Sequence, residues 1–430
     1  MFYGKARLKA EVAKHVDLDI ENLPFNTALI KQLVLLKESG EKLILTTAAN
    51  HRIANAVAMH LNIFDEVISS DDTNNLSNKA ETLVKRYGKQ GFDYAGNSRA
   101  DLKVWRNARH AFVVGPSLNL SLYEIEQVCT IDGRIPSPFG RLWEFIRCLR
   151  PHQWSKNLLL FLPIIAAHQL NDSGKLVLTI SGFLTYCILV SALYMFNDLL
   201  DLSSDRLHPE KKDRPFASGS VPILFGLIMV PLMVGGALTL GWLISNKFLM
   251  ALSLYALVSL SYSLFLKNIV ILDVIILALL YVLRVISGGI VADINLSFWL
   301  LSFSMFFFFG LAFTKRFAEL LSLSERNQEF ISGRGYRKED LEITRVLGVA
   351  SGFLSILVLA LYINDESVVY HYNQPKFLWA FCPLLIYWVS HMWVIASRAE
   401  MHHDPIVFTM RDKTSWWIAL LGMVIFWMAI

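Results

Sequence analysis

The chain reads NDLLDLSSDR over residues 197–206, directly after an apolar run (176–196) that is long enough to cross a lipid bilayer. Carboxylates at the edge of a hydrocarbon core cost free energy unless a cation or hydrogen bonds compensate them. A membrane-spanning helix that ends in three aspartates therefore indicates a functional site at the membrane surface.

The spacing of these polar residues predicts their chemistry. If the helix continues, Asn197, Asp201 and Asp205 recur at every fourth residue and share one face. Such a row of oxygen ligands suits Mg²⁺, which proteins usually hold through one or two carboxylates and the phosphates of a substrate. We expect these three residues to bind Mg²⁺, and Asp198, beside them, to support the ligands as a further catalytic carboxylate.

The residues that follow carry the opposite charge. They are His208, Lys211, Lys212 and Arg214, and they are suited to phosphate oxygens that a metal leaves uncovered. Together with the aspartates they predict a diphosphate substrate at the bilayer surface. The simpler interpretation is an acidic helix cap before a positively charged cytoplasmic loop. However, a cap needs one carboxylate, and the positive-inside rule needs no acids.

Three segments resemble a known family. The pattern Asn-Asp-x-x-Asp-x-x-x-Asp at 197–205 resembles the first signature of the UbiA superfamily of intramembrane prenyltransferases. The continuation His-Pro-x-Lys-x-x-Arg-Pro at 208–215 and the segment Arg-Pro-His-Gln-Trp-Ser-Lys-Asn at 150–157 are similar to the branch that makes polyprenyl-phosphate phosphoribose. The resemblance implies that Arg150 and Lys156 contact the ligand, whereas the residues alone also fit a basic and aromatic membrane anchor.

A second polar group follows two spans later, so it emerges on the same face of the membrane. Asp273 and Arg284 are separated by about three helical turns and lie on nearly one face. A buried arginine must find a carboxylate, a carbonyl or a ligand phosphate, and an ion pair between helices is the structural alternative.

The family resemblance assigns this second group to the substrate. UbiA enzymes carry a second acidic signature here, often with two aspartates four residues apart. This chain has Tyr262, Lys267 and Asp273 but Leu277 at the second acidic position. The resemblance thus implies a substrate site with one carboxylate and more cations. Weaker matches occur in order along the chain at 315–320, 333–336, 404–408 and 411–412.

Composition and charge define the class of protein. The chain has 430 residues, of which 54% are hydrophobic and 18% charged, and its net charge of +4 does not indicate nucleic-acid binding. Its four isolated cysteines fit packing thiols better than a metal site or disulfides. We expect an all-α polytopic bundle (141–430) of about nine membrane-spanning helices, placed at 142–168, 175–200, 221–245, 247–266, 268–292, 297–322, 343–363, 375–397 and 415–430.

Loop charges predict the orientation of this bundle in the cytoplasmic (inner) membrane. Lysine and arginine concentrate in the loops on the side of the N-terminal region, whereas the opposite loops contain only Lys175, Lys247 and Lys376. The positive-inside rule places the N-terminal region in the cytoplasm, and an odd helix count leaves Ile430 on the far side.

Residues 1–135 read as a separate α/β domain. Strands at 42–47, 66–70, 92–95 and 111–114 alternate with helices, which predicts a parallel sheet. The domain is similar to the haloacid dehalogenase phosphatase superfamily. That resemblance implies that Thr46 or Thr47 and Lys79 bind phosphate and that Asp101, near Asn97, lies on the metal side.

The first catalytic motif of that superfamily, a strand ending in Asp-x-Asp, is not found. Asp17 and Asp19 match its letters, but no apolar strand precedes them. Without a nucleophilic carboxylate there is no phosphoaspartate route. We expect a truncated, structural remnant, or a native start upstream.

These expectations combine into one function. The resemblance implies transfer of 5-phosphoribose from phosphoribosyl diphosphate to a polyprenyl phosphate, with Mg²⁺ as cofactor and diphosphate as leaving group. Lys156, Tyr262, Lys267 and Arg284 are expected to position the lipid phosphate. An aromatic prenyltransferase that uses an isoprenyl diphosphate and a transporter for an anionic metabolite are the alternatives. The sequence is compatible with a homo-oligomer.

Overall fold

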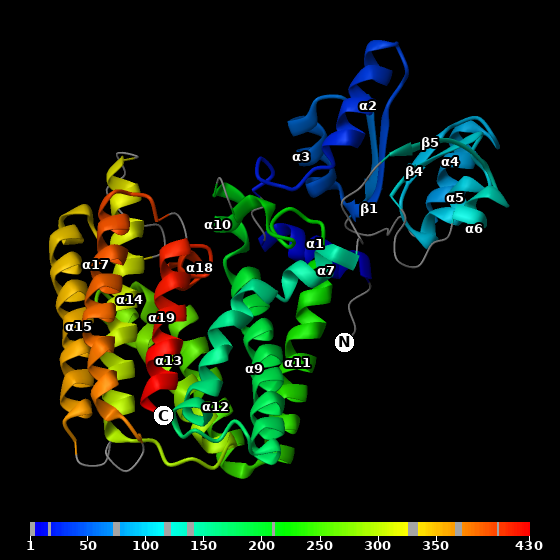
Figure 1. Cartoon of the computed structure of the whole chain (residues 1–430). Helices are drawn as coiled ribbons and strands as arrows, with labels where there is room; N and C mark the ends of the chain where they lie inside the picture. Colours follow the sequence, from blue (N-terminus) through cyan, green and yellow to red (C-terminus); the bar gives the residue numbers. More distant parts are fainter. Residues whose placement is uncertain are drawn as a thin grey trace. The chain divides into compact units, whose positions relative to one another are not determined.

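The computed structural model describes residues 5–15, 19–71, 78–115, 122–135, 142–208, 211–325, 334–365, 372–401 and 404–430 (Figure 1). The chain divides into two compact units. Unit 1 comprises Met1–Cys148 and Asp198–Leu227, and unit 2 comprises Leu149–Asn197 and Ile228–Ile430.

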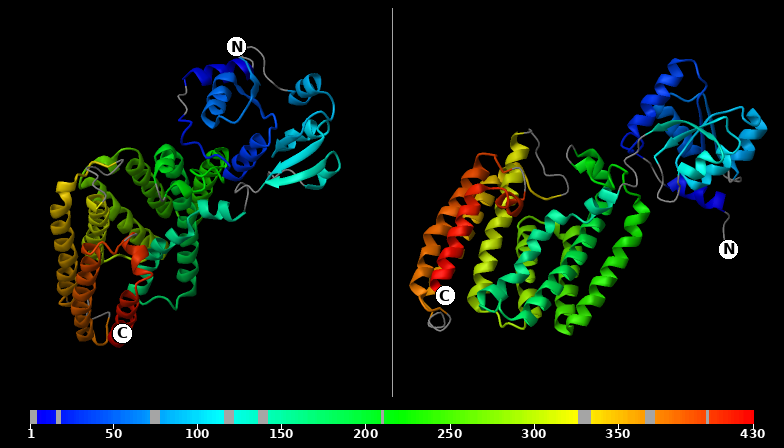
Figure 2. Two further views of the ribbon diagram at one scale, coloured as in Figure 1. Left: turned by 90° about the horizontal axis from the view of Figure 1, so that it is seen from above. Right: turned by 45° about the vertical axis from the view of Figure 1, so that its right-hand side comes forward.

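The N-terminal part of unit 1 is an α/β domain in which every paired strand is parallel, as predicted. Its strands form two sheets, β1-β2 and β3-β4-β5, with helices around them (Figure 2). The elements are α1 (Lys5–His15), α2 (Thr27–Glu38), β1 (Ile44–Asn50), α3 (His51–Leu61), β2 (Glu66–Ser70), α4 (Lys79–Tyr87), β3 (Tyr94–Gly96), η1 (Arg99–Asp101), α5 (Leu102–Trp105), β4 (His110–Val114), α6 (Leu122–Glu126) and β5 (Thr130–Ile135).

Each predicted strand of this domain is present, and one strand was missed. The missed strand, β5, reads TIDGRI and contains aspartate and glycine, which are depleted in strands. The core forms where α4 buries Ala80 and Leu83 against Ile68 of β2 and Val104 of α5. The rest of unit 1 includes α7 (Leu142–Cys148), α10 (Leu202–Leu207) and the short 3₁₀ helix η3 (Lys211–Asp213).

Unit 2 is helical. It begins with η2 (Pro151–Phe161) and α8 (Leu162–Ala166). Its long helices, of which α9 and α11 also contribute residues to unit 1, are α9 (Ser173–Leu200), α11 (Ile223–Ile244), α12 (Asn246–Leu264), α13 (Leu272–Val291), α14 (Phe298–Glu325), α15 (Leu341–Ile363), α17 (Phe381–Ser397) and α19 (Lys413–Ala429). The short elements are η4 (Leu266–Asn268), η5 (Lys338–Asp340), η6 (Pro375–Ala380) and α18 (Pro405–Thr409).

Seven helices of the described chain are long and apolar enough to span a membrane, and each coincides with a predicted span. The chain is therefore a multi-pass membrane protein. The count of nine is not confirmed among the described residues. The predicted last span is the shorter helix α19.

The predicted first span at 142–168 is wrong as a single helix, because α7, η2 and α8 replace it. Arg150 has a positive φ of 50° and Pro151 follows it, so a continuous helix ends there.

Helix α13 contributes residues to the main hydrophobic clusters of unit 2, and η2 packs against it. Gly288 of α13 allows this contact, because a Cβ there would lie 2.1 Å from the carbonyl oxygen of Leu160. On another side of the unit α14, α15 and α17 pack together (Figure 1). The close approach of η2 to α13 brings polar residues of both elements together, as described next.

Candidate functional site

The predicted carboxylate row belongs to two helices rather than one. α9 ends at Leu200, α10 begins at Leu202, and Asp201 lies at the junction with φ −89° and ψ 12°. The helix therefore does not continue unbroken through Asp201, and the predicted span does end at residue 200. The Asp205 backbone N–H still donates to the Asp201 carbonyl oxygen at 2.8 Å, so the four-residue spacing is kept across the break.

Arg214 connects two of these carboxylates. Its Nη1 lies 3.1 Å from Asp198 Oδ1 and 2.6 Å from Asp205 Oδ2. Both aspartates are buried. Burial raises the pKa of Asp205, and the neighbouring Asp198 raises it as well, whereas the Arg214 guanidinium lowers it. In this structure Arg214 thus neutralises the carboxylates of Asp198 and Asp205, whereas the sequence predicted that it binds phosphate beside them.

The other basic residues of the predicted site are more accessible. Lys211 and Lys212 form most of η3 and are exposed, and His208 at the end of α10 is half-buried. The predicted motif residue Pro209 lies outside the described residues. The exposed lysines can therefore reach a ligand in solution, and their predicted role in phosphate binding stays a prediction.

The donor set fits Mg²⁺ held partly by a substrate. Among the described residues, no group of three or more His, Cys, Asp or Glu side chains is placed to hold a metal ion. Asp198 and Asp205 are two buried carboxylates that both contact Arg214. Mg²⁺ is usually held by one or two such carboxylates, and substrate phosphates and waters complete its coordination. The ligand set of Asn197, Asp201 and Asp205 stays a prediction.

Unit 2 contains a charge-balanced network around Asp273. This carboxylate is fully buried and lies 2.5 Å from Arg316 Nη2 and 3.5 Å from Arg334 Nη1. Tyr336 donates its hydroxyl to it at 2.7 Å. Glu319 pairs with both arginines, so two cations meet two carboxylates.

Asp273 is therefore surrounded by protein partners, and Arg316 was not expected as one of them. Tyr262 joins the same network, because its hydroxyl accepts a hydrogen bond from Arg334 Nη1 at 3.1 Å. The predicted neighbour Lys267 lies half-buried in η4. The predicted substrate roles of Asp273, Tyr262 and Lys267 stay predictions.

A second cluster of unit 2 carries excess positive charge. The Oδ2 atom of Asp404 lies 2.8 Å from Lys156 Nζ and 3.2 Å from Lys315 Nζ. Burial alone would raise the pKa of Asp404, but the ammonium groups of Lys315 and Lys156 outweigh it and lower that pKa well below its usual range. Sequence reasoning used Lys156 but gave no separate role to Lys315 or Asp404, which are distant from it in the chain.

Arg284 belongs to this cluster and has neutral partners. Its guanidinium donates to Asn157 Oδ1 at 3.0 Å, to the Leu280 carbonyl oxygen at 2.8 Å and to the Tyr255 hydroxyl at 2.6 Å. Arg284 Cζ and Lys156 Nζ lie 5.4 and 5.9 Å from the centroid of the same Tyr281 ring. Among the described residues no carboxylate pairs with Arg284.

Arg150 lies at the start of η2. Its guanidinium stacks over the ring of Tyr194 at 5.2 Å, and Trp154 of η2 donates to the Ser191 hydroxyl at 3.0 Å. These contacts fix η2 to α9 and thereby position Lys156. The expected contact of Arg150 with a ligand stays a prediction.

In the N-terminal domain, two of the predicted phosphate-site residues, Lys79 and Asp101, lie close to one another. Lys79 Nζ is 4.0 Å from Asp101 Oδ1, and the Tyr94 hydroxyl donates to the same oxygen at 3.0 Å. Asp101 Oδ2 accepts from the backbone and hydroxyl of Ser98. Asp17 lies outside the described residues.

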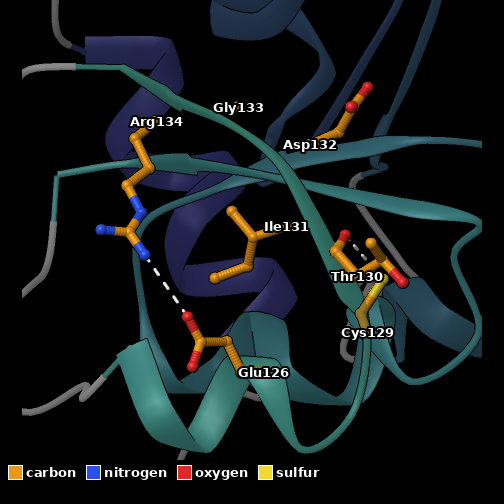
Figure 3. A pocket seen from close by; sticks show the side chains of 7 residues that line it. All are labelled: Glu126, Cys129, Thr130, Ile131, Asp132, Gly133 and Arg134. Atoms are coloured by element: carbon orange, nitrogen blue, oxygen red, sulfur yellow. Dashed lines mark hydrogen bonds and ion pairs between the residues drawn. The ribbon is translucent and has the colours of Figure 1, made fainter.

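An open depression lies elsewhere in this domain, along β5. Its lining residues are Glu126, Cys129, Thr130, Ile131, Asp132, Gly133 and Arg134 (Figure 3). Arg134 pairs with Glu126 at its side. None of the predicted site residues lines it.

Comparison with known proteins agrees with the fold. The UbiA prenyltransferase family matches residues 158–329. An uncharacterized protein, y4nM, of Sinorhizobium fredii is 33% identical over all of this chain and 83% of the relative. Nodulation protein NoeC of Azorhizobium caulinodans is 31% identical over 65% of this chain and 91% of the relative.

Two further similarities concern the helical part. A decaprenyl-phosphate phosphoribosyltransferase of Mycolicibacterium smegmatis is 35% identical over 42% of this chain and 58% of the relative. The structure of a UbiA homolog from Archaeoglobus fulgidus bound to GPP and Mg²⁺ matches 66% of this chain and 99% of that chain, with a TM-score of 0.51 and 16% identity. That likeness shows the fold alone.

The apolar helices and the match to the UbiA prenyltransferase family indicate a membrane-embedded transferase. The helical part of the chain contains a UbiA-type domain, which the family matches over residues 158–329.

Proposed function

We propose that the chain transfers 5-phosphoribose from phosphoribosyl diphosphate to a polyprenyl phosphate at the cytoplasmic face of the membrane, releasing diphosphate. One observation carries this choice: Lys156 and Lys315 both pair with the carboxylate of Asp404, and Arg284 lies near the same Tyr281 ring as Lys156, so three buried or half-buried cations gather near one carboxylate. An excess of cations suits a lipid that bears a phosphate, and similarity to the decaprenyl-phosphate phosphoribosyltransferase supports the same choice.

The carboxylates of unit 1 have a separate role in this proposal. Asp201 and Asp205, with Asn197, hold Mg²⁺ and Asp198 supports them. When bound, the Mg²⁺ ion neutralises charge on the diphosphate as it leaves. Lys211, Lys212 and Arg214 bind its remaining oxygens, and Arg214 exchanges its carboxylate contacts for phosphate contacts as the ligand enters.

The lipid phosphate is the nucleophile. Lys156 and Arg284 orient its oxygen toward the anomeric carbon of the sugar, while Tyr262 and Lys267 help to position it. Bringing two anions together is the main barrier to such a reaction, and fixed cations lower that barrier without the cost of reorganising water.

The remaining parts of the proposal concern location and the N-terminal domain. The N-terminal domain lies in the cytoplasm and the C-terminus on the far side of the inner membrane, which the excess of Lys and Arg in the loops on the N-terminal side supports. The domain, residues 1–135, is related to the haloacid dehalogenases, which the contacts among Lys79, Tyr94 and Asp101 support. We expect it to have a structural role and no phosphatase activity, because Asp17 and Asp19 do not follow an apolar strand that would present a nucleophile.

An aromatic prenyltransferase is the second candidate, because the Archaeoglobus homologs were solved with GPP and with DMAPP and Mg²⁺. That chemistry calls for a second acidic pair, whereas this chain has Leu277 at the second position. A transporter for an anionic metabolite needs no carboxylate row and is the third.

One experiment separates these activities. The purified full chain in detergent receives Mg²⁺ with phosphoribosyl diphosphate and a polyprenyl phosphate, or with geranyl diphosphate and an aromatic acceptor, and diphosphate release is measured. We expect release only with the first pair, and loss of release with EDTA. Release with the second pair alone would establish the aromatic prenyltransferase, and no release with either would favour transport.

A further inference from the structure

Asp404 occupies an unusual position between two lysines. Its Oδ2 atom accepts from both Lys156 and Lys315, while its Oδ1 atom accepts from the backbone N–H of Ile406 at the start of α18. The helix contact fixes the carboxylate, so the two flexible lysine side chains come to it rather than the reverse. Asp404 is thus a fixed internal counter-ion.

The cluster around Asp404 is not neutral. Among the residues that the structure describes, Lys156, Lys315 and Arg284 contribute three positive charges and Asp404 one negative charge, which leaves a net charge of +2. The described acids of the neighbouring network do not change this balance. Glu319 also interacts with Lys315, but Glu319 and Asp273 are matched in number by Arg316 and Arg334, so counting both groups together leaves the net charge at +2.

Excess charge at such depth is costly. The side chain of Lys156 is 6% exposed and that of Asp404 is 11% exposed, and Arg284 is 3% exposed. Buried charges without a matching partner are strongly unfavourable, and they mark sites that a ligand completes. Lys315, with 29% of its side chain exposed, is the member that a ligand reaches first.

The missing charge is −2. A phosphomonoester above its second pKa of about 6 carries a charge of −2 and has three acceptor oxygens. A phosphodiester, with a charge of −1, leaves one cation unmatched. A diphosphate monoester, with a charge near −3, adds an unmatched anion when no metal accompanies it.

We propose that Asp404 is a specificity-determining residue, which sets the net charge of the Lys156–Lys315–Arg284 cluster to +2 and so selects head groups that carry two negative charges. Only the identification of the ligand as a lipid phosphate rests on the function proposed above. The charge selection itself is a property of unit 2.

Single substitutions change the charge that the cluster needs. Asp404→Asn raises the net charge to +3, and asparagine retains the oxygen that caps α18, since Asn and Asp are equally good N-caps. Lys315→Gln lowers it to +1 at a partly exposed position. The double variant Asp404→Asn/Lys315→Gln returns it to +2 with two residues changed.

The test compares three probes with the same tail: farnesyl phosphate, farnesyl diphosphate and a methyl diester of farnesyl phosphate. Binding to the purified full chain in detergent is measured at pH 8 with EDTA, so that no metal contributes and the monoester is a dianion. Lys247→Gln, an exposed lysine at the start of α12, is the matched control.

We expect the wild type and the control to bind the monoester most tightly. In Asp404→Asn the ratio of affinities should shift toward the diphosphate, and in Lys315→Gln toward the diester, each by on the order of tenfold or more. The double variant should regain the wild-type order, which a purely structural role of Asp404 does not predict.

Two results would overturn the proposal: wild-type preference for the diphosphate in EDTA, or an unchanged order of affinities in Lys315→Gln, a variant that does not depend on the α18 cap. Because no sugar donor is present, failure of the proposed transfer reaction leaves this result intact. Conversely, if the enzyme transfers phosphoribose but does not discriminate among the three probes, only the proposed role of Asp404 is refuted.

Discussion

Asp273→Asn tests whether the balanced network of unit 2 supports the fold rather than the substrate. Asparagine has the size of aspartate and retains an oxygen for the Tyr336 hydroxyl, so the change removes charge and leaves packing intact. Arg316, which is fully buried, and Arg334 then share only the carboxylate of Glu319.

The expected loss of stability follows from this geometry. Removing one partner of a buried ion pair costs about 3–5 kcal/mol, and the remaining Glu319 places the effect near the lower end, at about 3 kcal/mol. We expect the midpoint of thermal unfolding in detergent, followed by tryptophan fluorescence, to fall by on the order of 5 °C. Asp293→Asn, an exposed aspartate after α13, is the matched control and should not shift the midpoint.

The assay also decides between two roles for Asp273. A structural residue predicts lower stability with phosphate-lipid affinity per folded molecule retained well below the midpoint. An unchanged midpoint combined with lost affinity would refute the structural role and restore Asp273 as a substrate ligand.

Three further predictions concern other parts of the chain. Asp201→Asn should abolish turnover with little change in the unfolding midpoint, because Asp201 lies at a half-buried helix junction; near-normal turnover at limiting Mg²⁺ would contradict the metal site. A cysteine at Lys211 should be labelled only from the cytoplasm and one at Asp365 only from outside; labelling of both from one side would refute the orientation. Asp101→Ala should leave phosphoribosyl transfer largely intact, and the chain should show no phosphatase activity; a beryllofluoride adduct on an aspartate of this domain would reveal a nucleophile.

The membrane spans were predictable because their signal is local. A run of apolar residues long enough for a bilayer forms a helix whatever its neighbours are, since backbone groups in lipid must be satisfied within the segment. The first expected span failed for a local reason too: Arg150 has a positive φ and Pro151 lacks a donor, which divides the stretch into short helices. Strand β5 was missed because it contains aspartate and glycine, which are rare in strands.

The partners of the site residues were not predictable from spacing. Asp273 and Arg284 lie about three turns apart on α13 and were expected to face one site. In the structure Asp273 pairs with Arg316 of α14, whereas Arg284 contacts Asn157 of η2 and Tyr255 of α12. These contacts depend on which helices pack against each end of α13, and that information is not contained in the sequence of one helix.

The two networks on α13 also explain how one bundle combines stability with binding. The network at Asp273 matches each arginine with a carboxylate, which compensates the buried charges and orders the helices. The cluster at Arg284 leaves two positive charges unmatched, which breaks the rule that buried charges are paired. Such violations are expected at functional sites, because the free protein is strained there until a ligand enters. The unmatched cluster, rather than the balanced network, is therefore where an anionic substrate gains most by binding.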